Sequence, residues 1–334
     1  MSRPLIIGHR GASHLAPENT LVSFRTAKTL GADGIEMDVQ MTRDKHLVIA
    51  HDFVTDRVAG VHRDIFDADF DDLRTLDFGS WKSPEFAGEK IPTLEEVLEV
   101  GREMEMIQIE LKPYFDRDKD FVERVLDTVV SMGCEKNTVL TSFQYDLLRQ
   151  VKERMPEMRT AALFLNMESC FCPPPALWTD LGLTNGDPLL DKLSGPQSAV
   201  AALSLMESGE LEEENGFLYQ YVRDRYLALL SNFPGQDLLE IFQDYVRQID
   251  TLGYVQQFDF PVDYIGPTYY GCFRDTSLIQ RGTAAGFGMV PWPMFPESRR
   301  DLRSLVQMQP EIIVTNKPEE LISILHGKNA VTSE

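Results

Sequence analysis

Residues 4–40, PLIIGHRGASHLAPENTLVSFRTAKTLGADGIEMDVQ, contain the pattern that decides the fold. A short apolar run at 4–8 precedes an amphipathic segment of helical length at 20–30, and a second strand-like run follows at 34–40. A strand, a helix and a strand in this order are typical of a parallel sheet that is covered by helices.

The same alternation continues along the rest of the chain. Further strands are predicted at 106–111, 138–142, 160–165, 262–267, 287–292 and 311–315. Further helices are predicted at 94–104, 119–132, 144–155, 275–285, 298–308 and 318–326. We expect Asn19 to cap the first helix, Gly31 to end it, and Thr93 with Glu96 to form a capping box. Eight strand–helix units in 334 residues predict a (β/α)8 barrel.

One short stretch after the second strand departs from the alternation. Residues 41–51 leave no room for a helix, and the segment 42–46 is polar and turn-like. We therefore expect 36–41 and 46–51 to form an antiparallel hairpin. Residues 53–92 are acidic and rich in loop formers, which predicts a small insertion.

A longer stretch, 166–261, far exceeds the length that one crossover helix needs. Helical spacing at 197–208, 211–231 and 236–252 predicts a helical insertion subdomain there. The expected organisation is a single catalytic barrel over 1–334 that contains both insertions. Long loops after barrel strands lie on the face that carries the site in such folds. The insertion is therefore expected to cover part of the rim of that site and to restrict what binds there, and it could also join two copies of the chain.

Composition narrows the classes of function. The 32 basic and 53 acidic residues give a net charge of −21, which disfavours binding to nucleic acids and to anionic membranes. No apolar run is long enough for a membrane span, and the N-terminus lacks the apolar region of a signal peptide. The four cysteines form no Cys-x-x-Cys pair. These features predict a cytoplasmic protein with reduced thiols.

Acidic side chains alternate with apolar ones on two predicted strands. Glu36 and Asp38 share one face of 34–40, about 6.5–7 Å apart along the strand. Glu110 and Lys112 likewise share one face of 106–111 and its end. Buried carboxylates need a cation or hydrogen bonds, and oxygen ligands suit hard ions. Glu36, Asp38 and Glu110 therefore predict a site for one divalent cation, Ca²⁺ or Mg²⁺.

Two histidines are expected beside this cation. The hairpin places His51 opposite the stretch that holds the two acids, and His9 ends the neighbouring first strand. Together with Arg10 and Lys112, they make a site suited to phosphoryl chemistry, because cations stabilise negative charge and imidazoles move protons near neutral pH.

At these residues the sequence resembles the glycerophosphodiester phosphodiesterase family, whose members are phospholipase-C-like phosphodiesterase TIM barrels. The matching motifs are His9-Arg10-Gly11, Pro17-Glu18-Asn19-Thr20, Glu36-x-Asp38-Val39, Thr42-x-Asp44, His51-Asp52 and Glu110-Leu111-Lys112. The resemblance is strong over 4–165 and weak over 262–322. It implies a metal-dependent hydrolase that cleaves glycerophosphodiesters to an alcohol and glycerol 3-phosphate.

The resemblance also implies a role for each of these residues. His9 and His51 would be the general acid and base. Glu36, Asp38 and Glu110 would bind the metal, and Arg10 and Lys112 would hold the phosphate.

The C-terminal third departs from the family pattern. The run Trp292-Pro293-Met294-Phe295 stands where the family usually has a Trp-Thr-Val-Asn-like run. Trp292 is still expected to line the alcohol pocket. The identity of that alcohol is left open.

Three functions remain from the sequence. The leading one is hydrolysis of small glycerophosphodiesters, with a small phosphodiester as the partner molecule. A lysophospholipase D-like enzyme would use the same residues on larger lipids. A catalytically silent barrel that binds a partner is the third, but none of the expected site residues is missing.

Overall fold

The computed structural model describes residues 3–113, 119–165, 171, 179–184, 187–193, 198–230 and 250–327. The chain divides into two compact units. Unit 1 comprises Met1–Leu163, Asp259–Tyr269 and Ser277–Glu334, and unit 2 comprises Phe164–Phe258 and Tyr270–Thr276.

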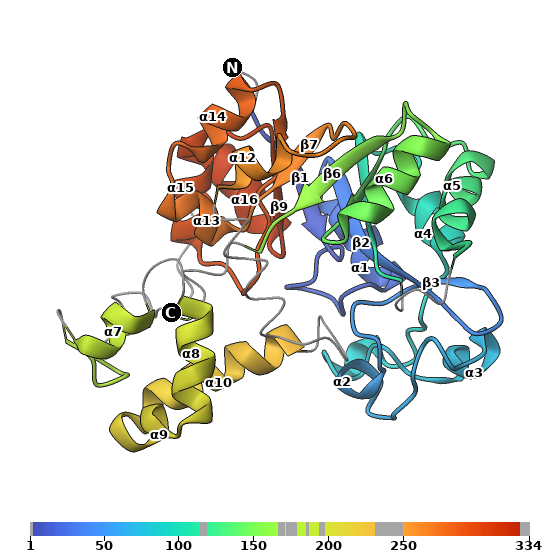
Figure 1. Ribbon diagram of the computed structural model, residues 1–334. Helices are drawn as coiled ribbons and strands as arrows, with labels where there is room; N and C mark the ends of the chain where they lie inside the picture. Colours follow the sequence, from blue (N-terminus) through green and yellow to red (C-terminus); the bar gives the residue numbers. More distant parts are fainter. Residues whose placement is uncertain are drawn as a thin grey trace. The chain divides into compact units, whose positions relative to one another are not determined.

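Unit 1 is a nearly closed barrel of parallel strands, as predicted (Figure 1). The strand order is β8-β7-β6-β5-β4-β2-β1-β9. The strands are β1 (Leu5–His9), β2 (Gly34–Met41), β4 (Met106–Leu111), β5 (Thr138–Ser142), β6 (Arg159–Leu163), β7 (Tyr264–Gly266), β8 (Gly288–Met289) and β9 (Ile312–Thr315). The backbone N–H of Val314 donates to Pro291 O at 3.1 Å, which joins β9 to the segment after β8.

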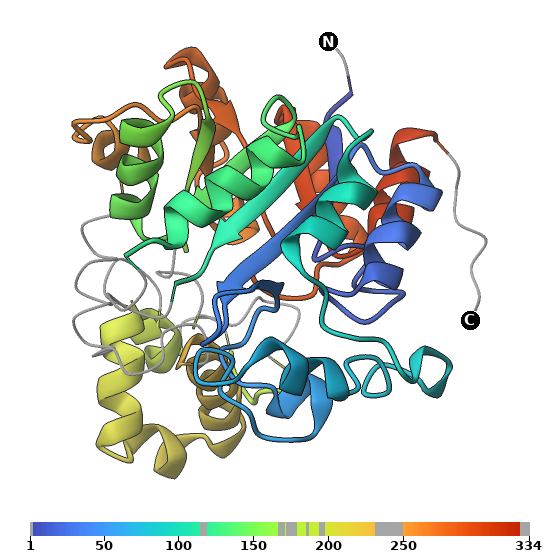
Figure 2. The same cartoon turned by 90° about the vertical axis from the view of Figure 1, so that its right-hand side faces the viewer.

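Helices cover the outer face of this barrel, and Figure 2 looks onto the layer formed by the first half of the chain, coloured blue to green. They are α1 (Leu21–Leu30), α4 (Leu94–Gly101), α5 (Phe121–Ser131), α6 (Tyr145–Arg154), α14 (Leu278–Ala284), α15 (Arg299–Met308) and α16 (Pro318–Leu325). Gly31 ends α1 with φ 90°, and Thr93 and Glu96 form the predicted capping box of α4.

The prediction that Asn19 caps α1 was wrong. Thr20 is the cap residue: its backbone is extended, and its side chain accepts a hydrogen bond from the backbone N–H of Ser23. Asn19 has φ 56° and directs its amide to the Asp38 carboxylate instead.

The barrel interior changes from apolar to polar along the strands. One interior layer is apolar and consists of Ile7, Met106, Val139, Ala161, Tyr264, Val290, Ile312 and Val314. Farther along β1, β2 and β4, toward their carboxyl ends, His9 pairs with Glu36 and Glu36 with Gln108. Ile35, which directly precedes Glu36, faces outward toward Gly101 of α4, so the two acids of β2 project to the opposite, inner face.

The predicted hairpin is confirmed. β3 (Leu47–Ile49) runs antiparallel to β2, with Val39 opposite Ile49 and Met41 opposite Leu47. Asp44 shapes the turn by accepting a hydrogen bond from Thr42 Oγ1 at 2.6 Å. The following insertion contains α2 (Asp56–Ala59), α3 (Phe70–Thr75) and the 3-10 helix η1 (Pro84–Phe86), which surround their own small apolar core.

One predicted strand is much shorter than expected. The interval 287–292 was expected to be extended throughout, but β8 ends at Met289. Pro291 and Pro293 have no backbone N–H for a ladder, which explains the early end. Trp292 consequently lies outside β8, where it forms an isolated parallel β-bridge with Thr268 and its backbone N–H donates to Pro267 O at 3.1 Å.

Unit 2 is helical in the part that the structure describes. Its helices are α7 (Pro188–Leu193), α8 (Ser198–Glu207), α9 (Glu210–Glu214), α10 (Gly216–Leu230) and α12 (Thr251–Val255), and α13 (Tyr269–Arg274) begins at the last residue of a unit 1 segment. The helical spacing predicted at 197–208 is confirmed by α8. The segment predicted at 211–231 forms two helices, α9 and α10, which are separated at Asn215, and residues 197, 231 and 236–249 lie outside the described residues. The organisation as one barrel domain with two insertions stays a prediction.

Among the described residues, no helix has the length and apolar character needed to cross a lipid bilayer. Cys134 and Cys272 are buried free thiols, and Cys170 and Cys172 lie outside the described residues. The cytoplasmic location stays a prediction.

Candidate active site

The acidic cluster predicted from the sequence is present inside the barrel. Asp38 of β2 lies directly opposite Glu110 of β4, and Glu36 lies one inward position earlier on β2. Each of the three carboxylates offers one oxygen, and these oxygens all lie within 4.8 Å of one another. The period of two along parallel neighbouring strands therefore brings three acids to one point.

The cluster is electrostatically strained when no cation is bound. Burial and the charges of Asp38 and Glu110 raise the pKa of Glu36 well above its usual value. Burial likewise raises the pKa of Glu110 to about 7, against the opposing charge of Lys112. Burial would also raise the pKa of Asp38, but the charges of Lys112 and Arg10 outweigh it and hold that pKa well below its usual range.

These three side chains fit a hard divalent cation. Asp38 Oδ1 is buried and has no hydrogen-bond donor, whereas Asp38 Oδ2 accepts from Asn19 Nδ2 at 2.8 Å. A buried carboxylate oxygen that accepts no hydrogen bond, together with two further carboxylates, is a suitable ligand set for an oxygen-preferring ion. The cluster can thus hold a metal ion.

His9 stands at the end of β1 beside this cluster, with Nε2 3.9 Å from Glu36 Oε2. Its other ring nitrogen, Nδ1, lies 2.7 Å from Asn316 Oδ1. The Asn316 amide is oriented by Glu297, since its Nδ2 donates to Glu297 Oε2 at 2.6 Å. An amide oxygen can only accept, so His9 Nδ1 carries the ring proton and Nε2 keeps its lone pair.

The environment of His9 favours the neutral imidazole. Burial lowers the pKa of His9 to about 3, and the adjacent charge of Arg10 acts in the same direction. The turn that follows requires glycine: Gly11 has φ 86°, and a Cβ there would lie 2.4 Å from Ser23 Oγ. The His-Arg-Gly motif therefore fixes the end of β1 tightly.

His51 follows the hairpin strand β3 and has a charged partner. Its Nδ1 lies 2.7 Å from Asp52 Oδ1, and Asp52 Oδ2 accepts from Arg57 Nε at 2.7 Å. Burial would raise the pKa of Asp52, but these hydrogen bonds hold it well below its usual range. A carboxylate can only accept, so Nε2 of His51 also keeps its lone pair in the neutral ring. Burial and the charge of Arg10 lower the pKa of His51.

The two predicted phosphate-binding cations lie against the acids. Arg10 donates its backbone N–H to Glu36 Oε2 at 3.0 Å and its Nη1 to Glu18 Oε1 at 2.8 Å. Its Nε is buried, has no hydrogen-bond acceptor, and lies 3.4 Å from Asp38 Oδ2. Lys112 Nζ lies 3.6 Å from Asp38 Oδ1 and 3.9 Å from Glu110 Oε1.

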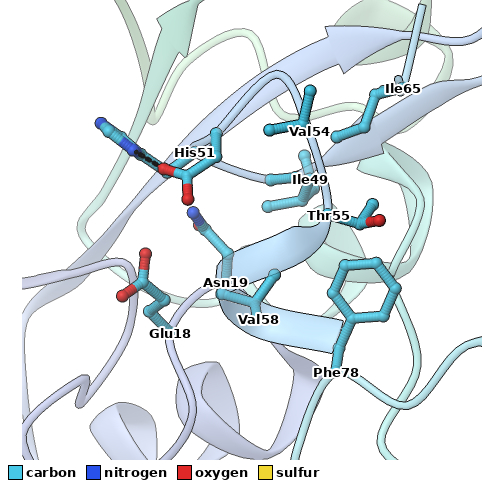
Figure 3. Close-up of a pocket in the computed structure, with 11 residues that line it drawn as sticks. Glu18, Asn19, Ile49, His51, Val54, Thr55, Val58, Ile65 and Phe78 are labelled. Carbon is cyan, nitrogen blue, oxygen red and sulfur yellow. Dashed lines mark hydrogen bonds and ion pairs between the residues drawn. The ribbon is translucent and has the colours of Figure 1, made fainter. Parts of the chain in front are cut away.

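Two pockets open around these residues. One, of about 300 Å³, is lined by His9, Glu36, Gln108, Glu110, Thr141, Leu163, Val290, Trp292 and Val314. Trp292 is fixed at its wall, because its Nε1 donates to Gly266 O at 3.0 Å and its ring meets the edge of Phe143. A second pocket of about 300 Å³ is lined by His51 (Figure 3).

In that second pocket, most polar side chains lie on one side and most apolar side chains lie on the other. Figure 3 shows the polar ends of Glu18 and Asn19 on the side of His51. The other side is mainly apolar: Thr55 lies there among the side chains of Ile49, Val54, Val58, Ile65 and Phe78.

Seven of the eight residues predicted for the site lie at the acidic cluster or line the pocket beside it, whereas His51 lines the second pocket. Sequence reasoning left the orienting residues Asp52, Arg57, Glu297 and Asn316 unassigned. Asp52 had a signal, because it follows His51 directly, whereas Arg57 and Glu297 had none. His14 and His62 make exposed ion pairs with Glu319 and Asp56, as is usual for surface histidines.

Comparison with known proteins gives consistent results. Residues 9–169 match the Glycerophosphoryl diester phosphodiesterase family. The glycerophosphodiester phosphodiesterase of Caldanaerobacter subterraneus is 37% identical over 163 residues, which is 48% of this chain and 67% of that protein. That of Bacillus altitudinis is 34% identical over 164 residues, or 48% of this chain and 67% of that protein.

Solved structures resemble the chain over nearly its whole length. An Oleispira antarctica phosphodiesterase in complex with the product sn-glycerol-3-phosphate aligns with a TM-score of 0.64 and 20% identity, over 97% of each chain. A glycerophosphodiester phosphodiesterase from Agrobacterium tumefaciens gives 0.60 and 20%, over 96% of this chain and 99% of that one. At this identity the likeness supports the barrel fold alone.

Proposed function

The chain belongs to the glycerophosphoryl diester phosphodiesterase family of phosphoric diester hydrolases, and from this premise we propose that it hydrolyses glycerophosphodiesters to an alcohol and glycerol 3-phosphate. The observation that carries the proposal is the pairing of three converging carboxylates with two histidines. Both imidazoles have Nδ1 occupied by an acceptor, so each has Nε2 available for proton transfer.

The reaction divides among this chain's own side chains. One neutral imidazole takes a proton at Nε2 from the attacking water. The other must first be protonated to the imidazolium, and it then gives its Nε2 proton to the departing alcohol oxygen. The new bond forms between the water oxygen and phosphorus, and the bond from phosphorus to the alcohol oxygen breaks. Arg10 and Lys112 are the cations that hold the charged phosphate.

Glu36, Asp38 and Glu110 would hold one divalent cation, Ca²⁺ or Mg²⁺. When bound, such an ion neutralises negative charge on the phosphoryl oxygens. Two observations support this assignment. Asp38 Oδ1 accepts no hydrogen bond, and a cation would give it a partner. The pKa values of Glu36 and Glu110 are raised, and a cation would offset the repulsion between the buried carboxylates.

The alcohol would occupy the pocket beside Trp292. Its wall combines the indole with the aliphatic side chains of Leu163, Val290 and Val314. Such a wall accepts an apolar alcohol portion more readily than a charged one.

The test is product analysis on a panel of phosphodiesters. Purified protein with Ca²⁺ or Mg²⁺ is incubated with glycerophosphocholine, glycerophosphoethanolamine, glycerophosphoglycerol and a lysophospholipid, and the products are followed by ³¹P NMR. We expect glycerol 3-phosphate from the water-soluble diesters. Cleavage of the lysophospholipid alone would favour a lysophospholipase D-like activity, and no cleavage of any diester would contradict the proposal.

The insertion 166–261 is proposed to influence the choice of alcohol and to join copies of the chain. It begins just after β6, and loops at the carboxyl ends of barrel strands carry specificity in such folds. Light scattering on the whole protein tests the association directly. A variant with a short Gly-Ser linker in place of 166–261 should change the ranking of the diesters more than the rate on the smallest one.

A further inference from the structure

Arg57, a residue of the small insertion, binds the carboxylates of Asp52 and Glu18, which in turn contact residues of the proposed active site. Arg57 lies on α2, and its Nε donates to Asp52 Oδ2 at 2.7 Å. Its two terminal nitrogens donate to Glu18, with Nη1 3.0 Å from Oε2 and Nη2 2.8 Å from Oε1. One face of the guanidinium lies 5.6 Å from the centre of the Trp81 ring. The planar group is thus held on three sides.

Each of the two carboxylates that Arg57 binds holds a residue of the proposed reaction. Asp52 accepts the Nδ1 proton of His51, and Glu18 accepts a hydrogen bond from Arg10 Nη1 at 2.8 Å. Both carboxylate side chains are largely buried, with exposures of 12% and 13%. Without a cation between them, the two negative groups would lose a shared donor and repel each other.

From this connection we propose that Arg57 is a positioning residue of the phosphodiesterase reaction, which fixes His51 through Asp52 and Arg10 through Glu18. The inference rests on the proposed function. A guanidinium suits this task because its donors form a rigid fork that can bind two carboxylates at once, whereas an ammonium is a single flexible point charge. The small insertion then serves catalysis by supplying this side chain.

A matched control exists in the same insertion. Arg74 of α3 makes a bidentate pair with Glu96, with distances of 3.0 and 2.8 Å, and lies over the Phe70 ring at 5.3 Å. It therefore repeats the interactions of Arg57 with a carboxylate and an aromatic ring. Neither Arg74 nor Glu96 is a proposed site residue or a hydrogen-bond partner of one.

The first experiment compares the kinetics of R57A, R57K and R74A with those of the wild type, at saturating divalent cation. Loss of a residue that orients reacting groups typically costs about 10- to 100-fold in activity, so we expect kcat of R57A to fall by that factor with a smaller rise in KM. R57K should be intermediate. R74A should stay within about twofold of the wild type even if its Tm falls. Equal kcat values for R57A and R74A would overturn the proposal.

A second readout does not depend on activity. In protein labelled with ¹⁵N-histidine, the Nδ1–H signal of His51, assigned with an H51A variant, should exchange slowly with water because Asp52 accepts it. R57A should broaden or shift this signal, and R74A should leave it unchanged. An unchanged signal in R57A would overturn the positioning role. A changed signal in a protein that cleaves no diester would leave that role standing and contradict the proposed function.

Discussion

His9 and His51 have the same imidazole side chain, but their Nδ1 atoms contact different kinds of partner. The partner of His9 is the neutral amide of Asn316, which the buried Glu297 orients from inside the barrel unit. The partner of His51 is the carboxylate of Asp52, which the half-exposed Arg57 holds from the small insertion. A carboxylate stabilises an imidazolium and an amide does so much less. The two histidines are therefore not interchangeable, and His51 is the better suited of the two to hold a proton.

The largest effects are expected from removing either imidazole. H9A and H51A should each lower kcat by about 10²- to 10⁴-fold, which is the usual scale for losing a general acid or base. Both residues lie at strand ends, so circular dichroism should show a folded protein for both variants. Turnover close to that of the wild type in purified H51A would contradict its role.

A smaller loss of activity is expected when the carboxylate beside His51 is replaced by an amide like the one beside His9. D52N removes the charge beside His51 and should lower kcat by about 10- to 100-fold. Its Tm should fall modestly, because Asp52 is only 12% exposed but its cationic partner Arg57 is half exposed and screened by solvent.

The reverse exchange, N316D, should affect stability as well. It places a new, half-buried carboxylate against the Glu297 carboxylate, which is only 4% exposed, and the two like charges repel each other. We therefore expect a lower Tm for N316D than for D52N. Thermal melting of the two variants checks this, and an N316D variant as stable as the wild type would show that Glu297 does not fix Asn316.

The smallest expected effect is on the pH dependence of stability, and it comes from Glu18. This residue binds both Arg10 and Arg57. Burial would raise the pKa of Glu18, but Arg10 and Arg57 lower it to about 2. A carboxylate with a lowered folded-state pKa stabilises the protein above its unfolded pKa of about 4.5, and that contribution is lost as the pH falls toward 2. The Tm difference between wild type and E18Q should thus be largest near pH 6 and should shrink below pH 4.5.

The exposed Glu85 supplies the control for this measurement. E85Q should follow the wild type over the whole range, because its side chain is outside the network. A Tm difference between wild type and E18Q that stays constant down to pH 2 would contradict the coupling to the two arginines.

Local pattern was sufficient to predict the barrel and the acidic cluster. The alternation in 34–40 and 106–111 fixes which side chains share a face, and parallel pairing then sets Asp38 opposite Glu110. The short turn at 42–46 likewise fixed the hairpin register. These relations involve residues close in sequence or on regular neighbouring strands.

The orienting residues could not be predicted in the same way. Asn316 is 307 positions from His9, and Glu297 reaches it from a segment outside any strand. Arg57 meets Glu18 across 39 positions through a helix of four residues. Such pairs form only through the tertiary arrangement, and no periodic pattern in the sequence indicates which residues will meet. Asn19 was predicted as a cap because its residue type favours both caps and buried polar contacts.

One divalent cation, held by Glu36, Asp38 and Glu110, is proposed to serve both histidines. The most direct test strips the protein with chelator, confirms its metal content by atomic emission, and measures turnover of glycerophosphocholine against added Ca²⁺ or Mg²⁺. We expect turnover to vanish in the stripped protein and to rise until one ion is bound per chain. H9A should bind the ion while its turnover stays about 10²- to 10⁴-fold below that of the wild type, and D38N should bind the ion poorly. Full turnover in wild-type protein that contains no metal would contradict this role of the cation.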